Sequence, residues 1–123
     1  MNIVDSSGWL EFFADGANAS FFAPVLGDAT ELLVPTISIY EVYKRVRQQR
    51  NRSDALAAIA VMQQGQVIDI DADIAVRAAE LSVAEKLPMA DSIMLACAKL
   101  HDAVLWTQDS DFRDISGVRF VDK

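Results

Sequence analysis

The amino-acid sequence predicts an α/β domain built on a parallel β-sheet. Short runs of β-branched and apolar residues alternate with longer segments whose apolar residues recur every three or four positions, as in repeated strand–helix units. The chain has 123 residues, of which 52% are hydrophobic and 24% charged, a composition typical of an ordinary folded domain. We therefore expect residues 1–123 to form a single domain.

Turn-forming residues separate the expected strands and helices. Pro35 stops the second strand and Pro88 breaks the fifth helix, while Ser53 is expected to cap the fourth helix and Gly65 to end it. The expected strands are residues 3–4, 32–34, 67–70, 104–106 and 118–121. The expected helices are residues 7–14, 19–26, 36–50, 54–64, 73–86 and 91–101.

The formal net charge of −7 argues at first against a nucleic-acid partner, because phosphate binding depends on Lys and Arg. The distribution of charge matters more, since five of the 11 basic residues fall within residues 44–52. Two bound divalent cations would also change the formal net charge from −7 to −3. The composition therefore leaves room for a nucleic-acid substrate.

Targeting features and cysteine content indicate where the protein acts. The first residues lack the basic segment and apolar run of a signal peptide, and no apolar stretch approaches the ~20 residues that cross a bilayer. We therefore expect a cytoplasmic protein without membrane insertion. Cys97 is the only cysteine, which excludes an intramolecular disulfide, and its apolar neighbours predict a place in the core.

Four acidic residues lie where the predicted elements meet at one edge of the sheet. Asp5 follows the first strand, Asp109 follows the fourth, and Glu41 lies in the first turns of the helix after the second. Asp91 opens a largely apolar helix, and it joins the others only if that helix starts at the same edge. Because ligands of open α/β sheets bind outside the carboxyl ends of the strands, these acids are candidates for one shared site.

Each of these acids also has a purely structural explanation. Ser38 and Glu41 match a capping box, in which each side chain satisfies a backbone N–H at the start of a helix. Asp91 is expected in a first helical turn, where a negative charge interacts favourably with the helix dipole. Asp5 and Asp109 each fit an N-cap or an Asx turn.

Taken together, the four acids predict metal-dependent chemistry. Carboxylates held close together repel, so some must bind protons or a cation must lie between them. Mg²⁺ and Mn²⁺ prefer such oxygen ligands, and two ions about 3.5 to 4 Å apart can stabilise both oxygens of a phosphodiester displacement. Other catalytic groups have less support, because His101 is the only histidine and no nucleophile elbow or glycine-rich phosphate loop is present.

Four segments resemble the motifs of a known family, and together they cover essentially the whole chain. They are residues 3–7 (IVDSS), 38–41 (SIYE), 90–98 (ADSIMLACA) and 105–112 (LWTQDSDF). In their order and spacing these segments are similar to the motifs of PIN-domain ribonucleases. The small, single-domain VapC-type toxins of toxin–antitoxin pairs are the most similar in length and layout.

The resemblance implies a three-layer α/β/α fold, with a five-stranded parallel sheet of order 3-2-1-4-5 and helices on both faces. It also implies cleavage of RNA with Mg²⁺ or Mn²⁺ as cofactor. Asp5 and Asp91 would then be the surest catalytic metal ligands, with Glu41 and Asp109 completing the site directly or through water. The resemblance further implies a cognate antitoxin protein as partner, and a homodimer.

Three further residues match positions beside the family's acidic site. Ser6 and Thr107 match small hydroxyl residues, which we expect to hold carboxylates or water in place. Asp111 matches a second acid of the last motif, and it is expected either as a peripheral ligand or as a turn-forming residue.

A basic stretch and a group of aromatic residues suggest binding surfaces. The basic residues beyond Glu41 are expected either to attract an RNA backbone or to form a solvated helix face; they are Lys44, Arg45, Arg47, Arg50 and Arg52. The aromatic residues of the first two helices are expected mainly in the core, with the remainder forming a groove for an antitoxin segment or a dimer contact; they are Trp9, Phe12, Phe13, Phe21 and Phe22.

Two other functions remain open from the sequence. One is a non-catalytic PIN-like module that binds RNA or a protein, although a module without activity would have no need to keep all four acids. The other is a flavodoxin-like phosphate-binding or receiver domain, which shares the doubly wound plan. The chain lacks the paired N-terminal acids and the late lysine that receiver domains use.

Overall fold

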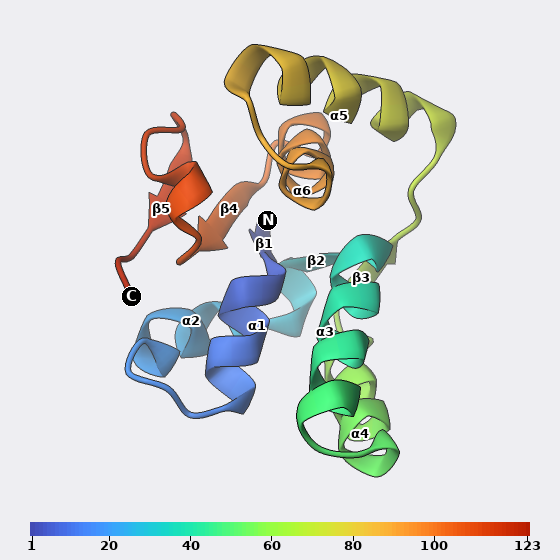
Figure 1. Ribbon diagram of the computed structural model, residues 1–123, viewed down its shortest axis with the longest axis vertical. Coiled ribbons are helices and arrows are strands. Elements are labelled where there is room, and N and C mark those ends of the chain that lie inside the picture. The colour runs from blue at the N-terminus through green and yellow to red at the C-terminus, as the bar shows by residue number, and fades with distance from the viewer.

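A parallel β-sheet runs through the middle of the molecule. The computed structural model describes residues 1–123, and its five strands are ordered β3-β2-β1-β4-β5 (Figure 1). The strands are β1 (Asn2–Val4), β2 (Leu32–Pro35), β3 (Gln66–Ile68), β4 (Val104–Thr107) and β5 (Val118–Phe120). The predicted fold class and strand order are confirmed.

Helices cover both faces of the sheet, as Figure 1 shows. One face packs against α5 (Ala72–Glu85) and α6 (Met89–Leu100). The opposite face carries α1 (Ser6–Phe13), α2 (Ala19–Leu26), α3 (Thr36–Gln49) and α4 (Arg52–Met62). Two short 3₁₀ helices, η1 (Ala29–Glu31) and η2 (Ser110–Phe112), complete the chain. None of these helices combines the length and the apolarity needed to span a membrane.

The alternation of side chains along the strands explains why the core has two halves. Successive side chains of a strand point to opposite faces, so Ile3 packs with α5 and α6 while Val4 packs with α1 to α4. Both side chains are fully buried. Strand β2 divides its residues in the same way, with Leu33 on one face and Val34 on the other. Burial on both faces accounts for the apolar runs that predicted the strands.

Many element boundaries differ from the sequence-based prediction by one residue, and those of three elements differ by two. Helix α4 is capped by Asn51 rather than Ser53, because the Asn51 side chain accepts a hydrogen bond from the backbone N–H of Asp54 at 2.8 Å. Strand β3 covers residues 66–68 rather than 67–70, and the chain then turns so that Asp71 can cap α5. Helix α6 begins at Met89, directly after Pro88, which places Asp91 inside its first turn.

The strand order places a crevice at the carboxyl edge of the sheet. Strands β2 and β3 lie on one side of β1, and β4 and β5 on the other. Successive strands are thus added on one side of β1 up to β3, and on its other side from β4 onwards. Open α/β sheets bind ligands at such a reversal of strand order, here between β1 and β4. Val4 pairs with Trp106 in the register of these two strands, so the residues that follow them, Asp5 and Thr107, emerge side by side.

Candidate metal site and its cavity

Asp5 lies at the centre of the site, where it is both a helix cap and a member of an acidic cluster. Its Oδ1 accepts hydrogen bonds from the backbone N–H of Gly8 at 3.0 Å and from the Ser7 hydroxyl at 2.7 Å. Its Oδ2 accepts a hydrogen bond from the Thr107 hydroxyl at 2.5 Å. Only 3% of the residue is exposed. The N-cap explanation of this acid is therefore correct, and it does not exclude a role in the cluster.

Gly8 allows helix α1 to approach the strand closely enough for this cap. A Cβ atom at residue 8 would lie 2.5 Å from Cγ1 of Val4 and 2.7 Å from Cε1 of Phe22. Real Cβ atoms do not come so close to other atoms, so any larger residue would push the first turn of α1 away from β1. The position of the Asp5 carboxylate thus depends on a glycine in the adjoining helix.

Three of the four predicted acids converge. Asp5, Asp91 and Asp109 each offer one carboxylate oxygen, and these oxygens lie within 4.8 Å of one another. Asp91 comes from the first turn of α6, while Asp109 caps η2 by accepting the backbone N–H of Asp111 at 2.9 Å. Helix α6 therefore starts at the same edge of the sheet as the strand ends, as the shared-site prediction requires.

Glu41 lines the same cavity but stands apart from the three converging aspartates. Its Oε1 accepts a hydrogen bond of 2.6 Å from the Ser6 hydroxyl, which agrees with the expected supporting role of Ser6. The capping-box explanation of Glu41 is wrong. Helix α3 begins at Thr36, and the buried Ser38 hydroxyl donates to the backbone carbonyl of Pro35 at 2.7 Å. The Glu41 side chain therefore caps no helix and lines the cavity.

Two acids of the cluster have strongly raised pKa values. Burial raises the pKa of Asp5 from 3.8 to about 6, although hydrogen bonds from Thr107, Ser7 and Gly8 act in the opposite direction. Burial also raises the pKa of Asp91 to about 8, with further increases from the charges of Asp109 and Asp5. No Lys or Arg side chain acts to lower either pKa. No Lys or Arg forms an ion pair with these acids either.

The cluster fits a hard divalent cation. All its donor atoms are carboxylate oxygens, the ligands that Mg²⁺ and Mn²⁺ prefer. A bound cation would lower the pKa of each acid, because opposite charge favours the ionised form. Asp5, Asp91 and Asp109 are the residues able to hold it, with Glu41 facing the same space.

The hydroxyl of Thr107 links two members of the cluster. This fully buried hydroxyl donates a hydrogen bond to Asp5 and accepts one from the backbone N–H of Asp109 at 2.9 Å. Ser7 adds a second link, since its hydroxyl donates to Asp5 and accepts the backbone N–H of Gln108 at 3.3 Å. The sequence predicted that Thr107 would hold a carboxylate in place, but it did not predict the same for Ser7. The position of Ser7, two residues after Asp5, could have indicated this contact.

The acids line a cavity of about 410 Å³, together with residues that were not singled out from the sequence. The additional polar side chains come from α1, α3, the segment after β4, and the last residue; they are Ser7, Glu11, Gln49, Gln108 and Lys123. Gln49 follows Glu41 and Arg45 at helical spacing, so its position could have been found from periodicity. Asp111 is exposed and does not line the cavity, although its carboxyl contributes to the raised pKa of Asp91.

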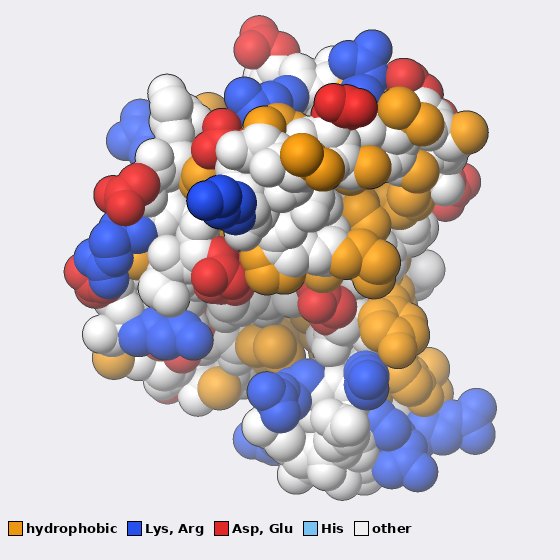
Figure 2. Space-filling model, turned by 45° about the horizontal axis from the view of Figure 1, so that its top comes forward, with side chains coloured by type: hydrophobic (Ala, Val, Ile, Leu, Met, Phe, Trp, Pro, Cys, Tyr) orange, Lys and Arg blue, Asp and Glu red, His pale blue; other side chains and the backbone are white.

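Only one residue of the predicted basic cluster reaches the acidic cavity. Figure 2 shows Lys and Arg side chains gathered over the lobe of α3 and α4, at the lower right of the view. Arg45 lines the cavity, four residues after Glu41 on the same helix. Arg50 instead pairs with Asp54 at 3.6 Å, and the Lys44 ammonium lies over the Tyr40 ring. Arg47 is exposed and lines neither described cavity.

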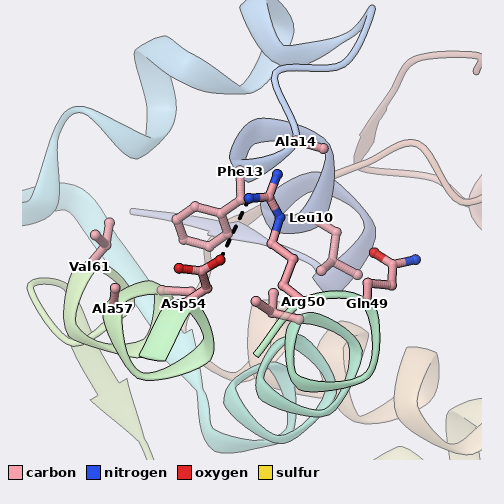
Figure 3. A pocket seen from close by; sticks show the side chains of 10 residues that line it. Leu10, Phe13, Ala14, Gln49, Arg50, Asp54, Ala57 and Val61 are labelled. Carbon is pink, nitrogen blue, oxygen red and sulfur yellow. Dashed lines mark ion pairs between the residues drawn. The ribbon is translucent and has the colours of Figure 1, made fainter. Parts of the chain in front are cut away.

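A second, mainly apolar cavity adjoins the first. It encloses about 390 Å³ between α1, α3 and α4, and Figure 3 shows the Arg50–Asp54 pair at its rim beside Phe13. Leu10, Ala14 and Gln49 line both cavities, so the two adjoin. Phe13 is the only one of the five aromatic residues that lines it, while Trp9 and Phe22 are buried as expected.

The fold and the site together define a three-layer α/β domain with a cluster of three acids at the carboxyl edge of its sheet. The chain belongs to the PIN domain family, because the family profile matches residues 3–118. The resemblance predicted from the four motifs is thus confirmed. Among curated proteins, sequence comparison finds no match.

Similar solved structures include the toxins of toxin–antitoxin complexes. A chain of a toxin–antitoxin complex from Klebsiella pneumoniae is 25% identical, with a TM-score of 0.79, and the match covers 96% of this chain and 95% of that one. VapC20 of Mycobacterium tuberculosis, a Sarcin-Ricin loop cleaving toxin, is 17% identical with a TM-score of 0.81 and coverage of 96% and 97%. A chain of VapBC2 from Rickettsia felis, bound to promoter DNA, is 12% identical with a TM-score of 0.74 and coverage of 98% and 97%.

Proposed function

We propose that the protein is an endoribonuclease that uses Mg²⁺ or Mn²⁺ to hydrolyse RNA phosphodiester bonds. The observation that carries this proposal is the convergence of carboxylate oxygens of Asp5, Asp91 and Asp109 within 4.8 Å, with no ion pair to a basic side chain. A site that needs a cation and opens into a cavity of about 410 Å³ suits a substrate that is itself an anion. Family membership supports the same activity.

In this proposal three aspartates bind the metal ion, and Glu41 contacts it directly or through water. Asp5, Asp91 and Asp109 bind the ion, and Ser7 and Thr107 hold the Asp5 carboxylate in one orientation. Held there, a divalent ion would supply an activated water and would polarise the phosphoryl oxygen. Glu41, oriented by the Ser6 hydroxyl, completes the site directly or through water. Attack on phosphorus would leave a 5′-phosphate and a 3′-hydroxyl.

Of the basic residues predicted to bind RNA, Arg45 is the best placed to bind its backbone. Its side chain lines the acidic cavity, whereas Lys44, Arg47 and Arg50 do not. Lys44, Arg47 and Arg50 remain part of the proposal as more distant charges that attract RNA to the α3–α4 lobe. Substituting Arg45 should therefore weaken RNA binding more than substituting Arg47, which is a matched arginine on the same helix.

Calorimetric titration with Mg²⁺ or Mn²⁺ tests the metal site and separates this function from a non-catalytic PIN-like module. We expect binding at millimolar metal to the parent protein and a large loss of affinity in Asp91→Asn. Asp69→Asn is the matched control, because Asp69 is exposed and lies outside the cluster. No heat of binding for the parent protein would favour the module and contradict the ribonuclease.

We further propose that residues 1–123 act as one PIN domain, as the toxin of a type II toxin–antitoxin pair, which a cognate antitoxin inhibits. The support is the similarity to chains of toxin–antitoxin complexes over almost their whole length. The apolar cavity between α1, α3 and α4 would hold an apolar antitoxin segment, and because this cavity adjoins the acidic one, the bound segment would block the site. Dimer formation is part of this proposal, and light scattering after gel filtration would measure it.

Co-expression with the protein encoded by an adjoining short reading frame tests the antitoxin groove. Val61 lines the apolar cavity and is 41% exposed, so Val61→Glu should abolish co-purification without unfolding the protein. Val83→Glu is the matched control, because Val83 is 82% exposed on α5, on the other face of the sheet. Equal co-purification of both variants would place the antitoxin elsewhere.

A further inference from the structure

A second cation, Lys123, lines the acidic cavity together with Arg45. The two residues come from distant parts of the chain, since Arg45 belongs to α3 and Lys123 follows β5. Figure 1 places the last residues of the chain and α3 on opposite sides of α1. The cavity that contains the acid cluster is therefore lined by basic residues from two separate parts of the fold.

Tertiary contacts hold the segment before Lys123 against the site. The Asn18 side-chain amide donates to the backbone carbonyl of Asp122 at 2.8 Å and to the side-chain carbonyl of Gln108 at 3.0 Å. The backbone N–H of Val121 donates to the carbonyl of Thr107 at 3.1 Å. An ion pair joins the Asp122 carboxylate to Arg113. These contacts fix the chain beside the end of β4, next to Asp109.

Neither flanking cation is used to neutralise the acids. No ion pair joins Lys123 or Arg45 to any carboxylate. Both cations line the cavity without a protein partner, so they are available to an anionic ligand that enters it.

We propose that Lys123 binds a phosphate of the RNA, on the opposite side of the acid cluster from the phosphate bound by Arg45. A single RNA strand would then cross the cluster from the α3 wall to the wall formed by residues 121–123, with the scissile phosphate between its two anchors. This inference rests on the ribonuclease function proposed above and adds the path of the substrate.

The salt dependence of RNA binding measures each phosphate contact separately. For single strands, each neutralised phosphate contributes about 0.7 to the slope of log K against log salt concentration. We expect Lys123→Gln and Arg45→Gln each to reduce the slope by about 0.7, and the double variant by about 1.4, because the two residues bind different phosphates. Lys123→Arg should keep the parent slope, since it keeps the charge.

The experiment is a fluorescence-anisotropy titration of a short labelled single-stranded RNA of mixed sequence, at several salt concentrations. Ca²⁺ replaces Mg²⁺ to slow cleavage, because it shares a preference for oxygen ligands. Lys99→Gln is the matched control, since Lys99 is an exposed lysine in the last turn of α6, away from the end that carries Asp91. Its slope should equal that of the parent.

The outcomes separate this inference from the function on which it rests. If the parent protein neither binds this RNA in a salt-dependent way nor cleaves RNA in Mg²⁺, both the proposed function and the inference fail. If the parent binds and cleaves, but Lys123→Gln has the same slope and affinity, Lys123 does not contact RNA and the inference alone is wrong. Tighter binding by Lys123→Gln would also overturn it, because Lys123 would then compete with the substrate.

Discussion

Replacing the buried carboxylate of Asp5 by an amide should stabilise the metal-free protein at neutral and alkaline pH. The folded protein raises the pKa of Asp5 from 3.8 to about 6, so folding opposes ionisation of this group. The resulting cost is absent below about pH 4, grows as the pH rises towards about 6, and stays constant above it. Asp5→Asn removes this cost while keeping an oxygen that can accept the N–H of Gly8.

The expected gain follows from the size of the pKa change. A rise from 3.8 to about 6, at about 1.36 kcal/mol per pKa unit, corresponds to about 3 kcal/mol of stability lost on ionisation. The amide recovers most of this, less any loss in its hydrogen bond with Thr107, so we expect a gain of about 2 kcal/mol. Asp91 titrates towards about pH 8, and removal of the Asp5 charge should also lower its pKa.

Urea denaturation with EDTA, from about pH 4 to about pH 8, measures the difference between Asp5→Asn and the parent. The two proteins should be nearly equal at the acidic end, and the variant more stable at the alkaline end. Adding Mg²⁺ should reverse the order, because only the parent binds it tightly. The reasoning is refuted if the variant is less stable at every pH, or if its advantage does not change with pH. Asp69→Asn should behave as the parent throughout.

Two other substitutions test the scaffold around the site. Thr107→Val removes the hydroxyl that donates to Asp5 and should cost about 1 to 3 kcal/mol in urea denaturation, with weaker Mg²⁺ binding in calorimetry; equal metal affinity would show that this hydroxyl does not hold the ligand in place. Gly8→Ala places a Cβ within 2.5 Å of Val4 and 2.7 Å of Phe22, and should cost about 1 to 3 kcal/mol in the same assay; an unchanged midpoint would contradict the close packing of α1.

Much of the fold could be predicted because local sequence patterns have local causes. The apolar pairs in β1 and β2 reflect burial on both faces, and the helices follow from periodic apolar residues. Boundaries were less predictable, since several residues compete for each cap. Asn51, rather than Ser53, caps α4 because its side chain reaches the N–H of Asp54, and no sequence rule ranks these neighbours.

The acids of the site were predictable because they follow strands or open helices that meet at one edge. The sequence could not separate cap from ligand at Asp5, since one carboxylate serves as the cap and joins the cluster. The capping box at Ser38 failed because α3 starts earlier than such a box requires. Lys123 could not be found at all, because its place depends on contacts of Asn18 with a distant part of the chain.

The most direct test of the central claim is the cleavage of purified RNA by the parent protein and by Asp91→Asn, each in Mg²⁺ and in EDTA. Asp91 is one of the three converging acids and is only partly buried, so its replacement should remove metal binding without disturbing the core. We expect cleavage only by the parent in Mg²⁺, leaving 5′-phosphate ends. Equal cleavage by the variant, or cleavage that persists in EDTA, would contradict a metal site built on these acids.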